Sequence, residues 1–119
     1  MECTYKDLKA WQKAMDLVTD IYATTKRFPW DEKDGLTSQM RRAAVSVPAN
    51  IAEGQGRRYE GEFQHFLRTA RGPLLELETL VQIATKLHYI QDPDSEHLLQ
   101  STAEVGRILN GLLASIRKN

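Results

Sequence analysis

Residues 63–84 read FQHFLRTARGPLLELETLVQIA and carry the clearest structural signal in the chain. Apolar residues recur there three or four positions apart, which places them on one face of an α-helix. That face consists of Phe63, Phe66, Ala70, Leu74, Leu77, Val81 and Ala84. We therefore predict a long amphipathic helix over residues 59–88 that packs one side against a core.

Three other segments repeat this pattern, and they predict helices over residues 7–27, 34–54 and 94–117. Their expected core faces are Leu8, Trp11, Met15, Val18 and Tyr22 in the first, Leu36, Met40, Ala43, Val47 and Ile51 in the second, and Leu98, Thr102, Val105, Leu109, Leu112 and Ile116 in the third. Asp31 or Asp34 is available to cap the helix over 34–54, and Asp92 to cap the last one. No segment alternates as a strand does.

Four amphipathic helices with short connections pack most simply as an antiparallel up-down four-helix bundle. The chain has 119 residues and a mass of 13.6 kDa, which suits one all-α domain over 1–119 with a single core. Sixteen Lys and Arg balance sixteen Asp and Glu, so affinity for nucleic acid requires a local basic patch.

The single cysteine, Cys3, excludes an intramolecular disulfide and a cysteine-based zinc cluster. No apolar run reaches the roughly 18 residues that a membrane span needs, and the first residues, MECTYKDLK, are charged where a signal peptide is apolar. We therefore expect a soluble, cytoplasmic protein with no membrane partner.

Apolar residues outside the expected core faces suggest a second buried surface, between identical subunits. They are Leu67, Leu75, Leu80, Ile83, Leu87, Leu99, Ile108 and Leu113. In addition, Trp30 lies in the connection FPW, where it either folds back over the end of the bundle or anchors a neighbouring subunit. The predicted oligomer interface comprises Trp30, Leu75, Ile83 and Leu113.

The segment VPANIAEGQGRR, residues 47–58, contains glycines that resemble a phosphate loop only superficially. It lacks the strand and the Lys-Ser/Thr pair of a Walker loop, and the spacing of Gly54, Gly56 and Gly61 does not fit a dinucleotide fingerprint. We interpret it as a helix end, with a bend at Pro48 and a left-handed exit at Gly54 and Gly56.

Basic residues are the main candidates for a binding site, because phosphate recognition needs several cations on one surface. The candidates are Lys26, Arg27, Arg41, Arg42, Arg57, Arg58, Arg68 and Arg71, with Tyr59 available to stack on a base. The alternative is that Arg41, Arg42, Arg68 and Arg71 pair with Glu53, Glu62, Glu76 or Glu78 on solvated helix faces. Arg57 and Arg58, adjacent in a loop, are expected to be the freest.

A metal-binding bundle enzyme is the rival interpretation, since di-iron bundles use Glu-x-x-His pairs. Glu62 and His65 form one such pair, but the sequence has no second one. We therefore predict no catalytic residue, metal or cofactor. A purely structural module for protein–protein assembly is a further alternative.

Three stretches carry a resemblance to a known family: DLKAWQKAMDLV at 7–18, RFPWDEKDGLTSQMRRAAVSVPANIAEGQGRR at 27–58, and EFQHFLRTARGPLLELETLVQIATKL at 62–87. The chain resembles the 23S rRNA intervening-sequence proteins, to which the accessory variability proteins of diversity-generating retroelements are similar. The most specific block is QMRRAAVSVPANIAEG, residues 39–54. Two positions depart from the family pattern: Pro73 replaces a usual serine, and Asp34 replaces a usual aromatic residue.

This resemblance implies a bundle that assembles into a ring, commonly a homopentamer, without catalytic activity. The biochemical role of the intervening-sequence proteins is not established, and their link to ribosomal RNA rests on gene location. The retroelement relatives have nucleic acid and a reverse transcriptase as partners. We therefore expect a non-enzymatic homo-oligomer whose partners are itself and RNA or an RNA-handling protein; the resemblance assigns no binding residue.

Overall fold

The structure is a computed structural model that describes residues 4–117; Cys3, with the prediction made for its thiol, lies outside the described residues. Within that range the chain forms four α-helices and two short 3₁₀ helices, with no strand. The α-helices are α1 (Lys9–Thr25), α2 (Leu36–Gln55), α3 (Glu60–Lys86) and α4 (Asp92–Arg117), and the 3₁₀ helices are η1 (Tyr5–Asp7) and η2 (Trp30–Glu32). The all-α prediction is confirmed.

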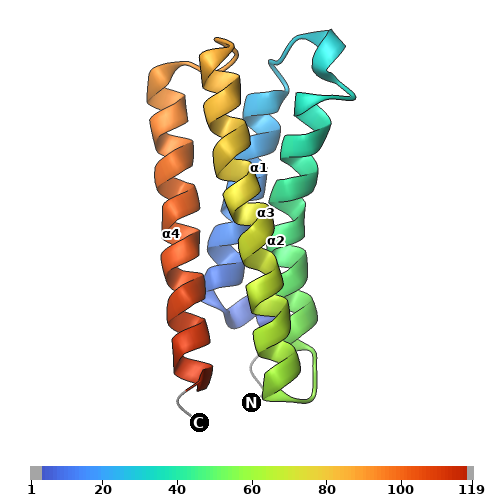
Figure 1. Ribbon diagram of the computed structural model, residues 1–119, viewed down its shortest axis with the longest axis vertical. Helices are drawn as coiled ribbons and strands as arrows, with labels where there is room; N and C mark the ends of the chain where they lie inside the picture. The colour runs from blue at the N-terminus through green and yellow to red at the C-terminus, as the bar shows by residue number, and fades with distance from the viewer. Residues whose placement is uncertain (1–3, 118–119) are drawn as a thin grey trace.

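The four helices lie side by side along the longest dimension of the molecule, which measures 46 × 24 × 23 Å (Figure 1). The α1–α2 and α3–α4 connections share one end of the bundle, and the α2–α3 loop lies at the other end (Figure 1). α2 packs between α1 and α3, and α4 packs against both α3 and α1. None of the described helices is long and apolar enough to cross a membrane.

The core faces of α2 and α3 follow the predicted periodicity. All five apolar positions expected in α2 are buried, from Leu36 to Ile51. In α3 the positions from Ala70 to Ala84 are buried as well, whereas Phe63 and Phe66 are only half-buried. Spacing alone therefore identified the faces that these two helices turn toward the core.

The predicted core face of α1 is wrong. The buried line is Ala10, Ala14, Leu17 and Ile21, whereas Met15 is 41% and Tyr22 is 42% exposed. Leu8, Trp11 and Val18 lie half-buried at the edge of the core. The physical reason is that α1 carries two neighbouring apolar lines about one residue apart, and the line with two alanines followed by Leu17 and Ile21 is the one that faces the core, so the other becomes its flank.

The helix caps also differ from the prediction. Neither Asp31 nor Asp34 caps α2; instead, the Leu36 N–H donates to Oε1 of Glu32 at 3.1 Å. α4 begins at Asp92 itself, so that carboxylate lies inside the first turn, where it still complements the helix dipole. A glutamate in η2 therefore takes the role expected of an aspartate.

Glu32 also connects the two loops at this end of the bundle. Its Oε2 accepts a hydrogen bond from the Tyr89 hydroxyl at 3.0 Å, and the Tyr89 ring packs against buried Phe28 at a centroid distance of 5.3 Å. This hydrogen bond, with partial burial, raises the pKa of the Tyr89 hydroxyl above its usual value. The connection after α1 is thereby joined to the connection after α3.

The glycines at the end of α2 do not make the left-handed exit that we expected, because no described glycine has a positive φ. α2 continues past both Pro48 and Gly54 to Gln55. Gly54 is buried, and a Cβ placed there would lie 2.7 Å from Cβ of Phe66. This glycine therefore permits close approach of α2 and α3 rather than a turn.

Candidate nucleic-acid interface

The outward face of α2 carries a line of polar residues. Because the buried residues of α2 occupy one side of the helix, Ser38, Arg42 and Ser46, spaced four apart, fall on the other side. Asn50 continues the line and is tied back to the helix, since its side-chain amide donates to the Ser46 carbonyl at 2.8 Å. This arrangement presents hydroxyl and guanidinium groups to solvent along several turns.

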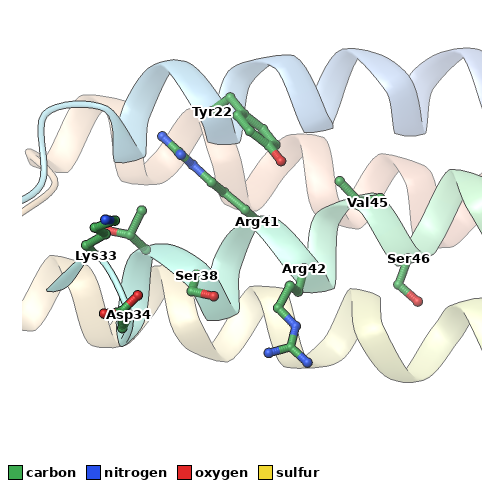
Figure 2. Close-up of a pocket in the computed structure, with 9 residues that line it drawn as sticks. Tyr22, Lys33, Asp34, Ser38, Arg41, Arg42, Val45 and Ser46 are labelled. Atoms are coloured by element: carbon green, nitrogen blue, oxygen red, sulfur yellow. The ribbon is translucent and has the colours of Figure 1, made fainter.

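An open groove of about 670 Å³ follows this face and extends to α1. Three cations line it against a single carboxylate, which makes the groove locally basic on a chain with no net charge. Its lining residues are Tyr22, Lys33, Asp34, Thr37, Ser38, Arg41, Arg42, Val45 and Ser46, of which eight are labelled in Figure 2.

Arg41 is held in a defined position against α1. Its Nε donates to Oγ1 of Thr25 at 2.9 Å, and its guanidinium lies over the Tyr22 ring, 4.5 Å from the ring centroid. Thr25 is buried, and its hydroxyl in turn donates to the Ile21 carbonyl at 2.7 Å. The chain therefore fixes both the side chain of Arg41 and the group that holds it.

Arg42 points to the opposite side of α2 from Arg41 (Figure 2). It also lines a second groove, of about 340 Å³, between α2 and α3, where Glu76 and Pro73 are among its neighbours. Despite that nearby carboxylate, Arg42 forms no ion pair with any residue in the described part of the chain. An exposed guanidinium without a carboxylate partner is available for an anion.

The loop after α2 contradicts our expectation that Arg57 is among the freest cations. Arg57 forms an ion pair with Glu53 at 3.1 Å and lies 4.9 Å from the centroid of the Phe66 ring. Arg58 lies 6.0 Å from the centroid of the Tyr59 ring, and Tyr59 is 65% exposed. Arg58 and Tyr59 are therefore the accessible pair in this loop.

Arg68 and Arg71 lie on the α4 side of α3, where both line a small groove with residues of α4. Arg71 donates to Oδ1 of Asn110 at 3.2 Å. None of the pairings that we considered for Arg41, Arg42, Arg68 and Arg71 with glutamates on the helix faces occurs between the described residues. No described carboxylate therefore forms an ion pair with any of those four arginines.

The candidate cations therefore form separate groups rather than one patch. Arg41 and Arg57 are sixteen positions apart in sequence, which corresponds to roughly 24 Å along a helix. Arg68 and Arg71 face α4 instead of the α1–α2 groove. Lys26 is exposed at the end of α1, and Arg27 pairs with Asp94 at 3.5 Å. The largest concentration is Lys33, Arg41 and Arg42 around the α1–α2 groove.

The four residues predicted for an oligomer interface differ in their exposure. Trp30 is 79% exposed and does not fold back over the bundle; Lys33 lies 4.7 Å from its ring centroid. Leu75 and Ile83, on the outer side of α3, are 64% and 41% exposed. Leu113 is only 5% exposed because it packs into the core of its own chain, so it offers no free surface.

The single Glu-x-x-His pair does not assemble with other metal ligands. Glu62 and His65 lie on exposed positions of α3, and the His65 ring contacts Phe66 edge-on at 5.4 Å. In the part of the chain that the structure describes, no three His, Cys, Asp or Glu side chains group in a way that would hold a metal ion. A di-iron site would require such a group.

Sequence reasoning missed Tyr22, Lys33, Ser38 and Ser46 as parts of the basic groove. Tyr22 was assigned to the core because it continues an apolar line, and Lys33 precedes the helix. A usable signal was present in α2, where Ser38, Arg42 and Ser46 recur every four residues opposite the apolar face. The contact of Arg41 with Thr25 depends on how α1 packs and has no local signal.

Comparisons with known proteins agree with the fold and with the suspected family. A crystal structure of a protein of unknown function, from the S23 ribosomal protein family of Bacteroides thetaiotaomicron, superposes with a TM-score of 0.80. That protein is 20% identical, and the match covers 87% of this chain and 97% of the other. No curated protein matches. The sequence model of the 23S rRNA-intervening sequence proteins matches residues 6–111, and the chain therefore belongs to that family.

Proposed function

We propose that this chain is a non-enzymatic, homo-oligomeric RNA-binding protein. In this proposal the helices of each chain run in alternate directions as an antiparallel up-down bundle, and the chains assemble into a ring, a homopentamer. RNA is bound mainly at the α1–α2 groove by Lys33, Arg41 and Arg42. Repetition of the groove around the ring raises the affinity of each chain for a long RNA.

The observation that carries this proposal is the set of cations around the groove without carboxylate partners. Arg41 and Arg42 form no ion pair with a described residue, and both line the same open groove. Arginine binds phosphate through two parallel N–H donors, and it binds strongly where no internal carboxylate competes. The exposed Arg58–Tyr59 pair at the far end of α2 adds a second, smaller contact for the same strand.

Exposed apolar side chains on two different surfaces support self-association. Leu75 and Ile83 lie on the outer side of α3, whereas Trp30 lies in η2 at the end of the bundle. A ring is built from contacts between two unlike surfaces of neighbouring copies, so two apolar surfaces per chain suit it. Neither surface shares a lining residue with the α1–α2 groove, and only Trp30 borders it, through its contact with Lys33. Light scattering of the purified protein measures the mass, which should be a multiple of 13.6 kDa.

The test is fluorescence anisotropy of a labelled stem-loop RNA, titrated with nucleic-acid-free protein from about 50 to 200 mM salt. We expect binding that weakens linearly on a log–log plot of affinity against salt. Arg42→Ala should weaken binding and reduce the slope by up to about 1. Arg107→Ala, which removes an exposed cation from α4, is the matched control and should leave both values unchanged.

Two outcomes would contradict the proposal. If the RNA does not bind even at the lowest salt, the RNA role is excluded, and the exposed apolar surfaces favour a module for protein–protein assembly. If Arg107→Ala lowers the affinity as much as Arg42→Ala does, binding is diffuse and the groove is not its site.

A further inference from the structure

The α1–α2 groove offers a flat stacking surface as well as positive charge. The Arg41 guanidinium lies over the Tyr22 ring at 4.5 Å, and Tyr22 keeps 42% of its surface exposed. Aromatic rings and arginine planes are the surfaces on which proteins stack the bases of unpaired RNA. A phosphate-binding patch needs only the charge, so the stacked pair indicates a more specific ligand.

The stacked pair is fixed before any ligand arrives. Arg41 donates to Thr25 at 2.9 Å, and the buried Thr25 hydroxyl donates to the backbone of its own helix at 2.7 Å. A side chain that is already ordered loses little conformational entropy when it binds. The guanidinium plane is therefore held in place for a planar partner rather than left as a mobile charge.

The rest of the groove suits the sugar–phosphate backbone of a strand. Lys33 and Arg42 flank the groove, and the hydroxyls of Ser38 and Ser46 lie along it, half-buried (Figure 2). Its volume of about 670 Å³ leaves room for a nucleotide lying along an open groove.

We infer that the α1–α2 groove binds an unpaired stretch of RNA, with one base stacked on the Arg41–Tyr22 pair and the adjoining phosphates at Arg42 and Lys33. This inference rests on the proposed function and narrows its ligand. In a duplex the bases are already paired and stacked, so a duplex reaches only the cations and leaves the stacking surface unused.

The test compares two probes that differ only in pairing. A labelled, unstructured RNA of roughly 12 nucleotides is long enough for one such site, and the second probe is the same strand annealed to its complement. Anisotropy titrations with the full chain should show that the single strand binds at least about tenfold more tightly than the duplex.

Variants of Tyr22 and Arg41 test whether the preference for the single strand arises from the stacked pair. Tyr22→Leu should lower the affinity for the single strand about tenfold and leave the duplex unaffected, whereas Tyr22→Phe keeps the ring and should bind as the parent does. Arg41→Lys retains the charge but loses the plane, so it should lower the affinity for the single strand without changing the salt slope. Circular dichroism melts verify that each variant is folded.

The failure of this inference is distinguishable from the failure of the proposed function. Equal affinity for the two probes, with the salt slope still dependent on Arg42, would overturn the inference and leave RNA binding intact. If the Tyr22→Leu variant still prefers the single strand, that preference does not arise from the stacked pair in the groove, and the inference is wrong. Absence of binding to either probe would overturn both proposals.

Discussion

α1 and α3 both carry regularly spaced large apolar residues, yet that spacing predicts the buried face of only one of them. In α3 the predicted residues Leu77 and Val81 are fully buried. In α1 the predicted residues Met15 and Tyr22 keep about two-fifths of their surfaces exposed, while Ala14 and Ile21 are fully buried. The two helices share the same apolar periodicity, but the residues on that period face the core in α3 and lie at its edge or in solvent in α1.

The difference lies in how the apolar residues are arranged around each helix. α1 has two apolar faces, one of large residues and one that includes Ala10 and Ala14. The structure buries the face that includes the two alanines, together with Leu17 and Ile21, and leaves the larger residues at the edge of the core or exposed. In α3 the apolar residues that flank the predicted line divide: Leu67 and Leu80 join the core, whereas Leu75, Ile83 and Leu87 stay exposed, so the predicted line remains the centre of the buried face.

The largest predicted effect tests this comparison directly. Leu77→Ala in α3 should destabilise the protein by about 2–5 kcal/mol, because it leaves a cavity in a fully buried site. Met15→Ala in α1 should cost less than about 1 kcal/mol, because that side chain is 41% exposed. Urea unfolding followed by circular dichroism measures both free energies of unfolding. Equal losses for the two variants would mean that Met15 belongs to the core after all.

A smaller effect is expected where α1 packs through its alanines. Ala14→Leu should cost about 1–3 kcal/mol, since a fully buried alanine has no room for three more carbons. Ala23→Leu makes the same change at an exposed position of the same helix and is the control, with an expected change within about 0.5 kcal/mol. Tolerance of Ala14→Leu in the same unfolding experiment would show that α1 does not approach its neighbours closely.

The helices themselves were predictable because each carries enough turns for its period to be read without ambiguity. The core faces of α2 and α3 were found for the same reason. Details that depend on a contact between elements were not predictable. Glu32, for example, caps α2 and also accepts a hydrogen bond from the Tyr89 hydroxyl. Gly54 suggested a turn by its local sequence, but its role is set by Phe66 on the next helix.

Some basic residues of the candidate site could be identified from the sequence, but their arrangement in space could not. Arg41 and Arg42 were identified as basic candidates, but their neighbour Tyr22 comes from another helix and their separation across α2 depends on packing. For Arg57 a local signal was available, since Glu53 lies four positions earlier, in the last turns of α2, and the ion pair joins that helix to the loop after it. An ion pair between residues close in sequence can be inferred from spacing, whereas a groove between helices cannot.

The smallest predicted effect concerns the contact that joins the connection after α1 to the end of α3. Glu32 raises the pKa of the Tyr89 hydroxyl because its carboxylate accepts a hydrogen bond from the protonated hydroxyl in the folded state and disfavours the phenolate. The unfolded chain lacks this partner, so Tyr89 ionises there near its usual pKa of about 10. The protonated hydroxyl therefore stabilises the fold fully below about pH 10, and that contribution is lost as the pH rises through the higher folded-state pKa.

Tyr89→Phe removes the hydrogen bond and the titration together while keeping the ring that packs on Phe28. Below about pH 10 the parent should be more stable than the variant, and above it the parent should lose stability more steeply, so that the two curves converge. Urea midpoints measured from neutral to alkaline pH report the difference in stability between the two proteins. The other tyrosines do not contribute to this difference because both proteins contain them. If the stabilities of the two proteins stay parallel across this pH range, Glu32 does not stabilise the protonated Tyr89 hydroxyl. The ends of α1 and α3 are then joined by apolar packing alone.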